Sequence, residues 1–140
     1  MPQLAKGGKW VFGWAVVGPK RQIPVPPEAW SEYRFHTGQQ AIFLRGSRRS
    51  GGFAISTPEL WPSAFGPWES APRVLGQAVI SAPEEVPLPP DIAVRPGQKL
   101  LVVRGSGNGL GFLAQGPIYE LAESHPDVQT FITKRSKEDE

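Results

Sequence analysis

Gln22-Ile-Pro-Val-Pro-Pro-Glu28 is repeated later in the chain as Glu85-Val-Pro-Leu-Pro-Pro-Asp91. Both stretches keep the same proline spacing and the same apolar and acidic positions. The residues that follow them also correspond, because Gly38-Gln-Gln-Ala-Ile-Phe-Leu-Arg-Gly-Ser47 aligns with Gly97-Gln-Lys-Leu-Leu-Val-Val-Arg-Gly-Ser106. We therefore expect two structurally equivalent halves within one chain.

The repeat extends over most of the sequence. Copy one covers about residues 10–60 and copy two about residues 73–119. Between them, Trp30–Thr37 corresponds only to Ala93–Pro96, a loss of four residues, or about one helical turn. The second copy should therefore have a turn where the first has a short helix. Residues 120–140 are expected to be a helical and then flexible tail.

The local patterns favour short strands. Lys9–Val17 is rich in aromatic and β-branched residues, and Ala41–Arg45 and Phe53–Ile55 are expected to pair as a hairpin. Each proline of the repeated motif removes a backbone donor, so this segment should be a strand end or a crossover. Pro26–Arg34, Thr57–Glu59 and Ile118–Glu123 suit short helices.

The composition limits the classes of protein to which this chain can belong. The 140 residues suffice for one domain, 1–140, and the absence of cysteine excludes disulfides and thiolate metal sites. No apolar run is long enough for a membrane span and no leader precedes the first strand, so a cytoplasmic protein is expected. Residues 1–70 hold eight Lys/Arg against four Asp/Glu, whereas residues 71–140 hold seven against nine, which makes the first half the basic one.

These patterns predict a mainly β fold. Two β-β-(α)-β-β copies, each too small to bury its own apolar face, should join as one pseudo-twofold barrel with short peripheral helices. The Pro-rich bridge between them carries Trp61, Phe65 and Trp68, and we interpret it as a packed connection within one domain.

The order of these motifs resembles the AbrB/MazE/SpoVT swapped-hairpin family. The resemblance is carried by Ile23-Pro24, the helix at Pro27–Arg34, the Gly38-Gln39 turn and the hairpin 41–55, and again by Val86-Pro87, Gly97-Gln98 and the strands of 99–114. It implies a swapped-hairpin β-barrel, which two tandem copies would close as a pseudo-dimer within a monomer. It also implies a DNA-binding transcriptional regulator that uses no cofactor.

The sequence departs from the family pattern at two places. Gln39 and Gln98 replace the usual turn aspartate, and Lys20-Arg21 of copy one becomes Pro83-Glu84 in copy two. A symmetric surface for reading palindromic DNA is therefore not expected. What remains is a one-sided basic surface, for which the candidate nucleic-acid contacts are Lys20, Arg21, Arg34, Arg45, Arg48 and Arg49. The competing interpretation is that these charges simply face water at loop tips.

Arg45 and Arg104 recur at matching positions. A shared structural role explains that recurrence well, either at a strand end or in a pair with a carboxylate across the pseudo-twofold. A function in binding is the alternative.

The glycine-rich stretch Gly105–Gly111 lies between two strands and has neither the dinucleotide fingerprint nor a P-loop lysine. A hairpin tip with positive φ angles accounts for it. A small-ligand or protein-binding module built on the paired loops is the alternative function, with Gly46, Ser47, Gly105, Ser106 and Asn108 as the candidate ligand residues.

Catalysis is not expected. His36 and His125 lie far apart in unrelated contexts, no nucleophile motif is present, and we predict no metal site or cofactor.

Overall fold

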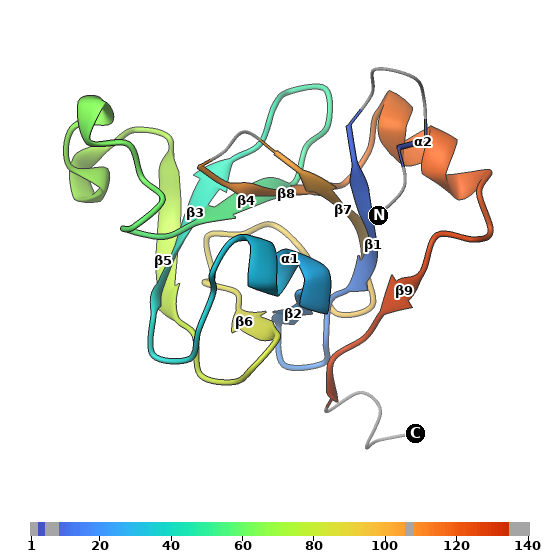
Figure 1. The fold of residues 1–140 in the computed structure, drawn as a ribbon, viewed down its shortest axis with the longest axis horizontal. Coiled ribbons are helices and arrows are strands. Elements are labelled where there is room, and N and C mark those ends of the chain that lie inside the picture. Colours follow the sequence, from blue (N-terminus) through green and yellow to red (C-terminus); the bar gives the residue numbers. More distant parts are fainter. Residues whose placement is uncertain (1–2, 5–8, 106–107, 135–140) are drawn as a thin grey trace.

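The computed structural model describes residues 3–4, 9–105 and 108–134. Two α-helices, two short 3₁₀ helices (η) and nine strands follow one another as shown in Figure 1. They are β1 (Val11–Val16), β2 (Gln22–Pro24), α1 (Pro27–Glu32), β3 (Gln40–Arg45), β4 (Phe53–Ser56), η1 (Ser63–Phe65), η2 (Trp68–Ser70), β5 (Val74–Val79), β6 (Glu85–Pro87), β7 (Lys99–Arg104), β8 (Leu110–Leu113), α2 (Pro117–Glu123) and β9 (Thr130–Phe131). The expected mainly β fold is confirmed.

The strands of the two copies are exchanged. One sheet has the order β5-β3-β4-β8-β7-β1-β9, and β2 and β6 form a separate two-stranded ribbon. β1 of the first copy pairs with β7 of the second, whereas β5 of the second pairs with β3 of the first. The registers are equivalent: Trp14 opposes Leu101 just as Gln77 opposes Ile42, and the same bulge interrupts both pairs.

A pseudo-twofold axis passes through two equivalent residue pairs. Ile23 opposes Val86 in the β2–β6 ribbon, and Phe53 opposes Phe112 where β4 meets β8. The rings of Phe53 and Phe112 stack with centroids 5.0 Å apart. Each copy therefore supplies half of every pairing along this axis, and neither copy can complete its share of the sheet alone.

The main core lies between the large sheet and the β2–β6 ribbon. Apolar side chains of both copies fill it, among them the fully buried Phe43, Ile55, Ile80 and Leu100. A second cluster lies on the outer side of β1 and β7, where Trp14 and Leu101 pack against α2.

The first copy has the expected short helix, α1, and the second has only turns between β6 and β7. Where a helix was expected at Thr57–Glu59, only one turn forms. The amides of Leu60 and Trp61 both donate to the carbonyl of Thr57, but the next residue, Pro62, has no amide to continue the helix.

The large sheet ends at β5 and β9. β9 pairs in parallel with β1, and the amide of Trp14 donates to the carbonyl of Gln129 at 2.8 Å. This strand was not expected from the sequence, which predicted only a helical and flexible tail after residue 119. Residues 135–140 of that tail lie outside the described residues. Within the described ranges, no helix is long and apolar enough to cross a membrane.

Candidate functional site

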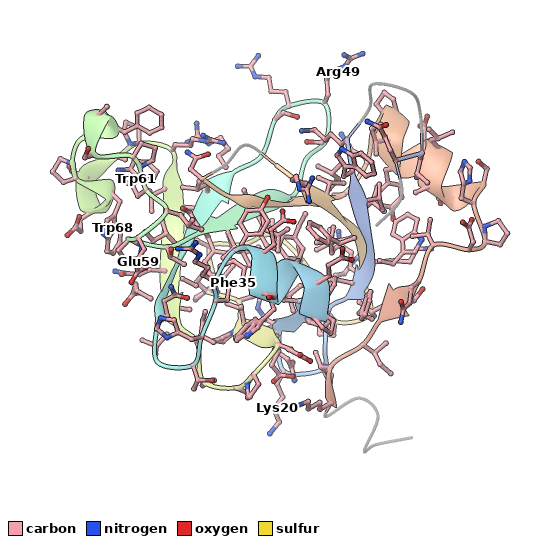
Figure 2. All side chains as sticks on the ribbon, viewed as in Figure 1. Lys20, Phe35, Arg49, Glu59, Trp61 and Trp68 are labelled. Atoms are coloured by element: carbon pink, nitrogen blue, oxygen red, sulfur yellow. The ribbon has the colours of Figure 1, made fainter. Side chains whose placement is uncertain are left out.

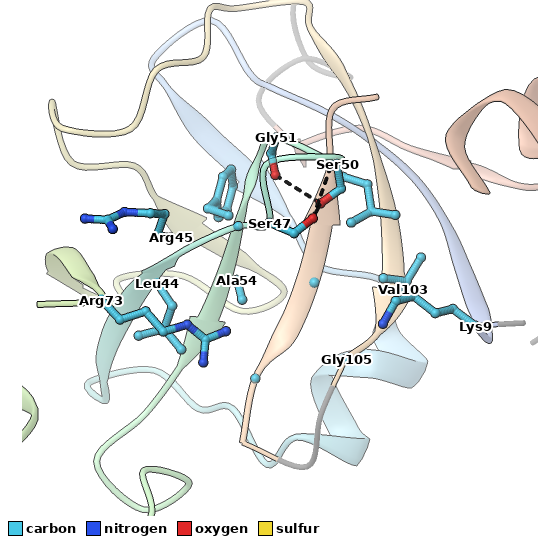
Figure 3. Close-up of a pocket in the computed structure, with 15 residues that line it drawn as sticks. Lys9, Leu44, Arg45, Ser47, Ser50, Gly51, Ala54, Arg73, Val103 and Gly105 are labelled. Carbon is cyan, nitrogen blue, oxygen red and sulfur yellow. Dashed lines mark hydrogen bonds between the residues drawn. The ribbon is translucent and has the colours of Figure 1, made fainter. Parts of the chain in front are cut away.

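A groove lies between the hairpins β3–β4 and β7–β8, along the line where β4 pairs with β8. We call it the seam groove; its volume is about 270 Å³. Figure 3 shows it from close by. Its lining residues are Lys9, Leu44, Arg45, Gly46, Ser47, Ser50, Gly51, Phe53, Ala54, Arg73, Val103, Gly105, Gly109, Gly111 and Leu113.

Small residues on the two central strands create the hollow. Ala54 opposes Gly111 in the β4–β8 pair, so almost no side chain rises from the floor. Leu44 and Val103, which occupy equivalent positions in the two copies, form apolar sides and are almost fully buried. A Cβ atom at Gly111 would lie only 2.9 Å from Cγ2 of Val103, so a larger residue there would crowd this side and narrow the groove.

The tip of the β3–β4 hairpin is held in one shape by its own hydrogen bonds. The hydroxyls of Ser47 and Ser50 lie 2.6 Å apart, and the amide of Gly51 donates to the carbonyl of Ser47 at 3.0 Å. Gly51 and Gly52 have φ angles of +59° and +62°, which glycine adopts with little strain. The tip thus presents the exposed side chains of Arg48 and Arg49 from an ordered turn.

Basic side chains reach the groove from three separate segments. In Figure 3 the amino group of Lys9 and the guanidinium of Arg73 point toward the seam from opposite sides, whereas Arg45 points away. Two equivalent backbone hydrogen bonds fix the segments that carry Lys9 and Arg73. Arg104 donates its amide to the carbonyl of Trp10, next to Lys9, and Arg45 donates its amide to the carbonyl of Arg73, both at 2.9 Å. The described lining includes no acidic residue.

The pairing partners of Arg45 and Arg104 differ between the two copies. Arg104 donates from Nε to Oε2 of Glu32 at 2.8 Å and from Nη2 to Oε1 at 2.5 Å, which raises the pKa of Arg104. Glu32 lies in α1 of the other copy, so the predicted pairing across the pseudo-twofold holds for Arg104. Arg45 instead donates to the carbonyl of Pro72 at 3.4 Å. The second copy has lost the helical turn that would carry the equivalent of Glu32.

Arg21, one of the predicted contacts, makes hydrogen bonds within the fold. Its guanidinium donates to three carbonyls of the second copy: Nη1 to Val94 at 2.5 Å, and Nη2 to Pro89 at 2.9 Å and Ile92 at 2.8 Å. Arg21 therefore stabilises the irregular segment that stands where the first copy has its helix, and these donors are already occupied within the fold. Arg21 and its equivalent Glu84 have left-handed φ angles, +56° and +60°.

Lys20 and Arg34 do not join the other basic candidates. Lys20 lies at the end of the molecule opposite Arg49 (Figure 2). Arg34 is exposed just after α1, with a φ angle of +57°, and it does not line the groove. Of the predicted set, Arg45 lines the groove, and Arg48 and Arg49 stand on the hairpin tip beside it.

The alternative ligand set is only partly assembled. Gly46, Ser47 and Gly105 line the seam groove, and Asn108 does not. Ser106 lies outside the described residues. Lys9 and Arg73 were missed, because each stands alone just before a strand and only the exchanged pairing brings these two segments to one groove.

The other described side chains offer little that could support catalysis or metal binding. Burial raises the pKa values of Tyr33 and Tyr119, and both rings pack against aromatic neighbours. Within the described ranges, no cluster of three or more His, Asp and Glu residues could hold a metal ion.

No protein-family model matches the chain, and neither the curated proteins nor the solved structures gave a match.

Proposed function

We propose that the chain is a non-catalytic DNA-binding module of the AbrB/MazE/SpoVT type, which contacts the phosphate backbone through one basic surface. We call this surface the hairpin face, and it consists of Lys9, Arg45, Arg48, Arg49 and Arg73. The observation that carries the proposal is that Lys9, Arg45 and Arg73 line a groove whose described lining has no acid. Arg48 and Arg49 add two exposed cations on the hairpin tip that follows Ser47 of that lining. The resemblance of the repeated motif to that family supports the same conclusion.

The hairpin face fits a phosphate backbone better than a base sequence. Arginine guanidinium groups bind phosphate oxygens bidentately, and Arg48 and Arg49 stand exposed on an ordered turn. Arg104, the equivalent of Arg45, is paired with Glu32, so the second copy does not repeat this free cation. We therefore expect binding with weak sequence preference and without palindromic symmetry.

Salt dependence is the direct test. If the five cations each neutralise one phosphate, the logarithm of the association constant should fall with the logarithm of the salt concentration with a slope of roughly −4.5. Arg48→Ala combined with Arg49→Ala should make that slope shallower by about 2. The measurement is fluorescence anisotropy of a labelled random-sequence duplex at several salt concentrations.

Lys20→Ala combined with Arg34→Ala is the matched control, because it removes the same charge from positions away from the hairpin face. This variant should keep the wild-type slope. No binding to any duplex at low salt would overturn the proposal, and so would equal effects of the two double variants.

The shape of the seam groove favours a second candidate function, binding of a small anion with an apolar body. Lys9 and Arg73 point toward a floor of Ala54 and Gly111 between the apolar sides Leu44 and Val103. A thermal-shift screen of aliphatic and aromatic carboxylates should then find a stabilising compound, because a ligand of the native state raises the unfolding temperature. Gly111→Val should abolish that shift, whereas Arg48→Ala, at the rim, should preserve it.

A further inference from the structure

β5 is an end strand of the large sheet whose outer edge no described strand covers. The edge is long for an uncovered one, and Val74-Leu-Gly-Gln-Ala-Val79 contains neither a charged residue nor a proline. The side chain of Val79 is 55% exposed. Natural proteins usually protect such edges with charges, prolines or a covering segment, so an unprotected edge marks a site of strand pairing.

The hydrogen-bonding groups at this edge can be placed from the pairing with β3. The amide of Ile80 donates to the carbonyl of Gln39 at 2.9 Å, so the peptide groups of Ile80 point toward the first copy. Because successive peptide groups of a strand alternate in direction, those of Val79 and Gln77 point away from β3. These two residues therefore present two amides and two carbonyls on the uncovered edge.

The pseudo-twofold relates the outer edge of β5 to the outer edge of β1, which is covered by another strand. Trp14 of β1 is the equivalent of Gln77, and its amide donates to the carbonyl of Gln129 on the segment that enters β9. In the first copy, the segment after β4 cannot do the same for β5, since it runs through η1 and η2 and joins β5 at Val74. Among the described residues, β9 thus covers the outer edge of β1, and no strand covers the outer edge of β5.

We propose that a second copy of this chain covers the β5 edge, and that two chains join through an antiparallel β5–β5 pair. A twofold axis at Ala78 would place Gln77 of each chain opposite Val79 of the other. In that register the outward amides and carbonyls of both residues exchange hydrogen bonds, four in all. The exposed side chain of Val79 would pack on the aliphatic part of Gln77, and no charge would oppose a like charge.

This proposal differs from the expectation of a monomer, which rested on two tandem copies closing as a pseudo-dimer within one chain. A second copy is favoured over an unrelated peptide because the edge is complementary to itself, so both uncovered edges are satisfied at once. It is also favoured over pairing of β5 with β9 of another chain. That contact would be head-to-tail, and it would leave an uncovered edge at each end of a growing chain.

The test is the mass in solution of wild type, Val79→Lys and Thr130→Lys, measured by light scattering after gel filtration over a range of concentrations. Wild type should reach twice the chain mass of 15.3 kDa, and Val79→Lys should stay at 15.3 kDa. Thr130→Lys, on the outer edge of β9, should behave as wild type. A wild-type monomer at every concentration would overturn the proposal, and a Thr130→Lys monomer would indicate head-to-tail pairing instead.

Amide hydrogen exchange on wild type provides a second measurement that needs no variant. The amides of Gln77 and Val79 should exchange more slowly as the protein concentration rises, while the amide of Trp14 should show no such dependence. Exchange at Gln77 and Val79 that does not depend on concentration would contradict pairing between copies, even if the mass indicates a dimer.

Discussion

Arg104 donates two hydrogen bonds to Glu32, and this ion pair joins the second copy to the first. Arg45, the equivalent arginine of the first copy, has only a carbonyl acceptor at 3.4 Å. The difference follows from the four residues that the second copy lacks, because they include the counterpart of Glu32. The length difference between the copies thus leaves one of two equivalent arginines, Arg45, without the carboxylate that the other has.

Glu32→Gln should therefore strengthen DNA binding. Release of Arg104 would add a sixth cation near the groove, and the slope of the salt dependence should steepen by up to about 0.9. The free energy of unfolding should change little, because the pair is solvent-exposed. Anisotropy titrations and urea unfolding measure the two effects.

Glu69→Gln is the matched control for that prediction, because it removes the same charge from the exposed bridge between the copies. It should leave the slope nearly unchanged. If both variants strengthened binding equally, the effect would come from net charge and the Arg104–Glu32 pair would have no part in it.

Arg21→Met should destabilise the fold without changing the salt slope for DNA. The carbonyls of Pro89, Ile92 and Val94 would lose their charged donor, although those of Pro89 and Ile92 would keep a backbone donor. A hydrogen bond to a charged group contributes about 1.5–3 kcal/mol. Urea unfolding measures the loss. Lys20→Met, at the exposed neighbouring position, should change the free energy of unfolding by no more than about 0.5 kcal/mol. A loss of DNA affinity in a folded Arg21→Met variant would show that Arg21 belongs to the DNA-binding surface.

The repeat in the sequence predicted a mainly β fold made of two equivalent halves. The missing turn was also visible, as the shorter segment Ala93–Pro96. These features depend on the pattern of apolar residues, prolines and glycines, which a sequence displays directly. The antiparallel ribbon in which Ile23 opposes Val86 was not predicted, because the prolines indicated only a strand end or a crossover.

The candidate site was less predictable because it depends on which charges find partners. Lys20-Arg21 is one basic pair in the sequence, yet Arg21 turns inward to three carbonyls while Lys20 faces solvent. Lys9 and Arg73 are distant in sequence and meet at the groove only through the exchanged pairing. β9 could not be predicted, because its two residues are too few to produce a periodic pattern of apolar side chains.

Phe112→Ala and Phe53→Ala should destabilise the fold to a similar extent, about 3–5 kcal/mol each, because both rings are buried at the pseudo-twofold axis. A double-mutant cycle should give a coupling of about 0.5–1.5 kcal/mol for the stacked pair. Urea unfolding of the four proteins measures it. Coupling indistinguishable from zero would mean that the two copies do not depend on each other at this contact.

Acid should weaken the fold partly through Glu59. A backbone hydrogen bond from its own amide, together with the side-chain amide of Gln39, lowers the pKa of Glu59 below its usual 4.5. The unfolded chain then binds this proton more readily than the folded one. The stabilisation is therefore complete above pH 4.5 and is lost as the pH falls through the lowered value. Glu59→Gln should flatten this part of the dependence of the urea midpoint on pH, and an unchanged profile would assign the loss to other carboxylates.

Gly13→Ala should detach β9 from the sheet. Gly13 has a φ angle of +148°, and a Cβ atom there would lie 2.7 Å from the carbonyl oxygen of Gln129 and 2.7 Å from the ring of Phe131. The amide of Trp14 should then lose its acceptor and exchange faster with solvent.

Gly76→Ala is the control at the equivalent position of β5, where the nearest atom is Cγ of Pro89 at 3.1 Å and no strand lies beside it. It should leave the exchange of Trp14 unchanged. Because Gly13→Ala would uncover the β1 edge as well, the variant should also form assemblies larger than a dimer at high concentration. Slow exchange of Trp14 in Gly13→Ala would show that β9 can shift to admit the methyl group, and that the glycine is not what holds the strand in place.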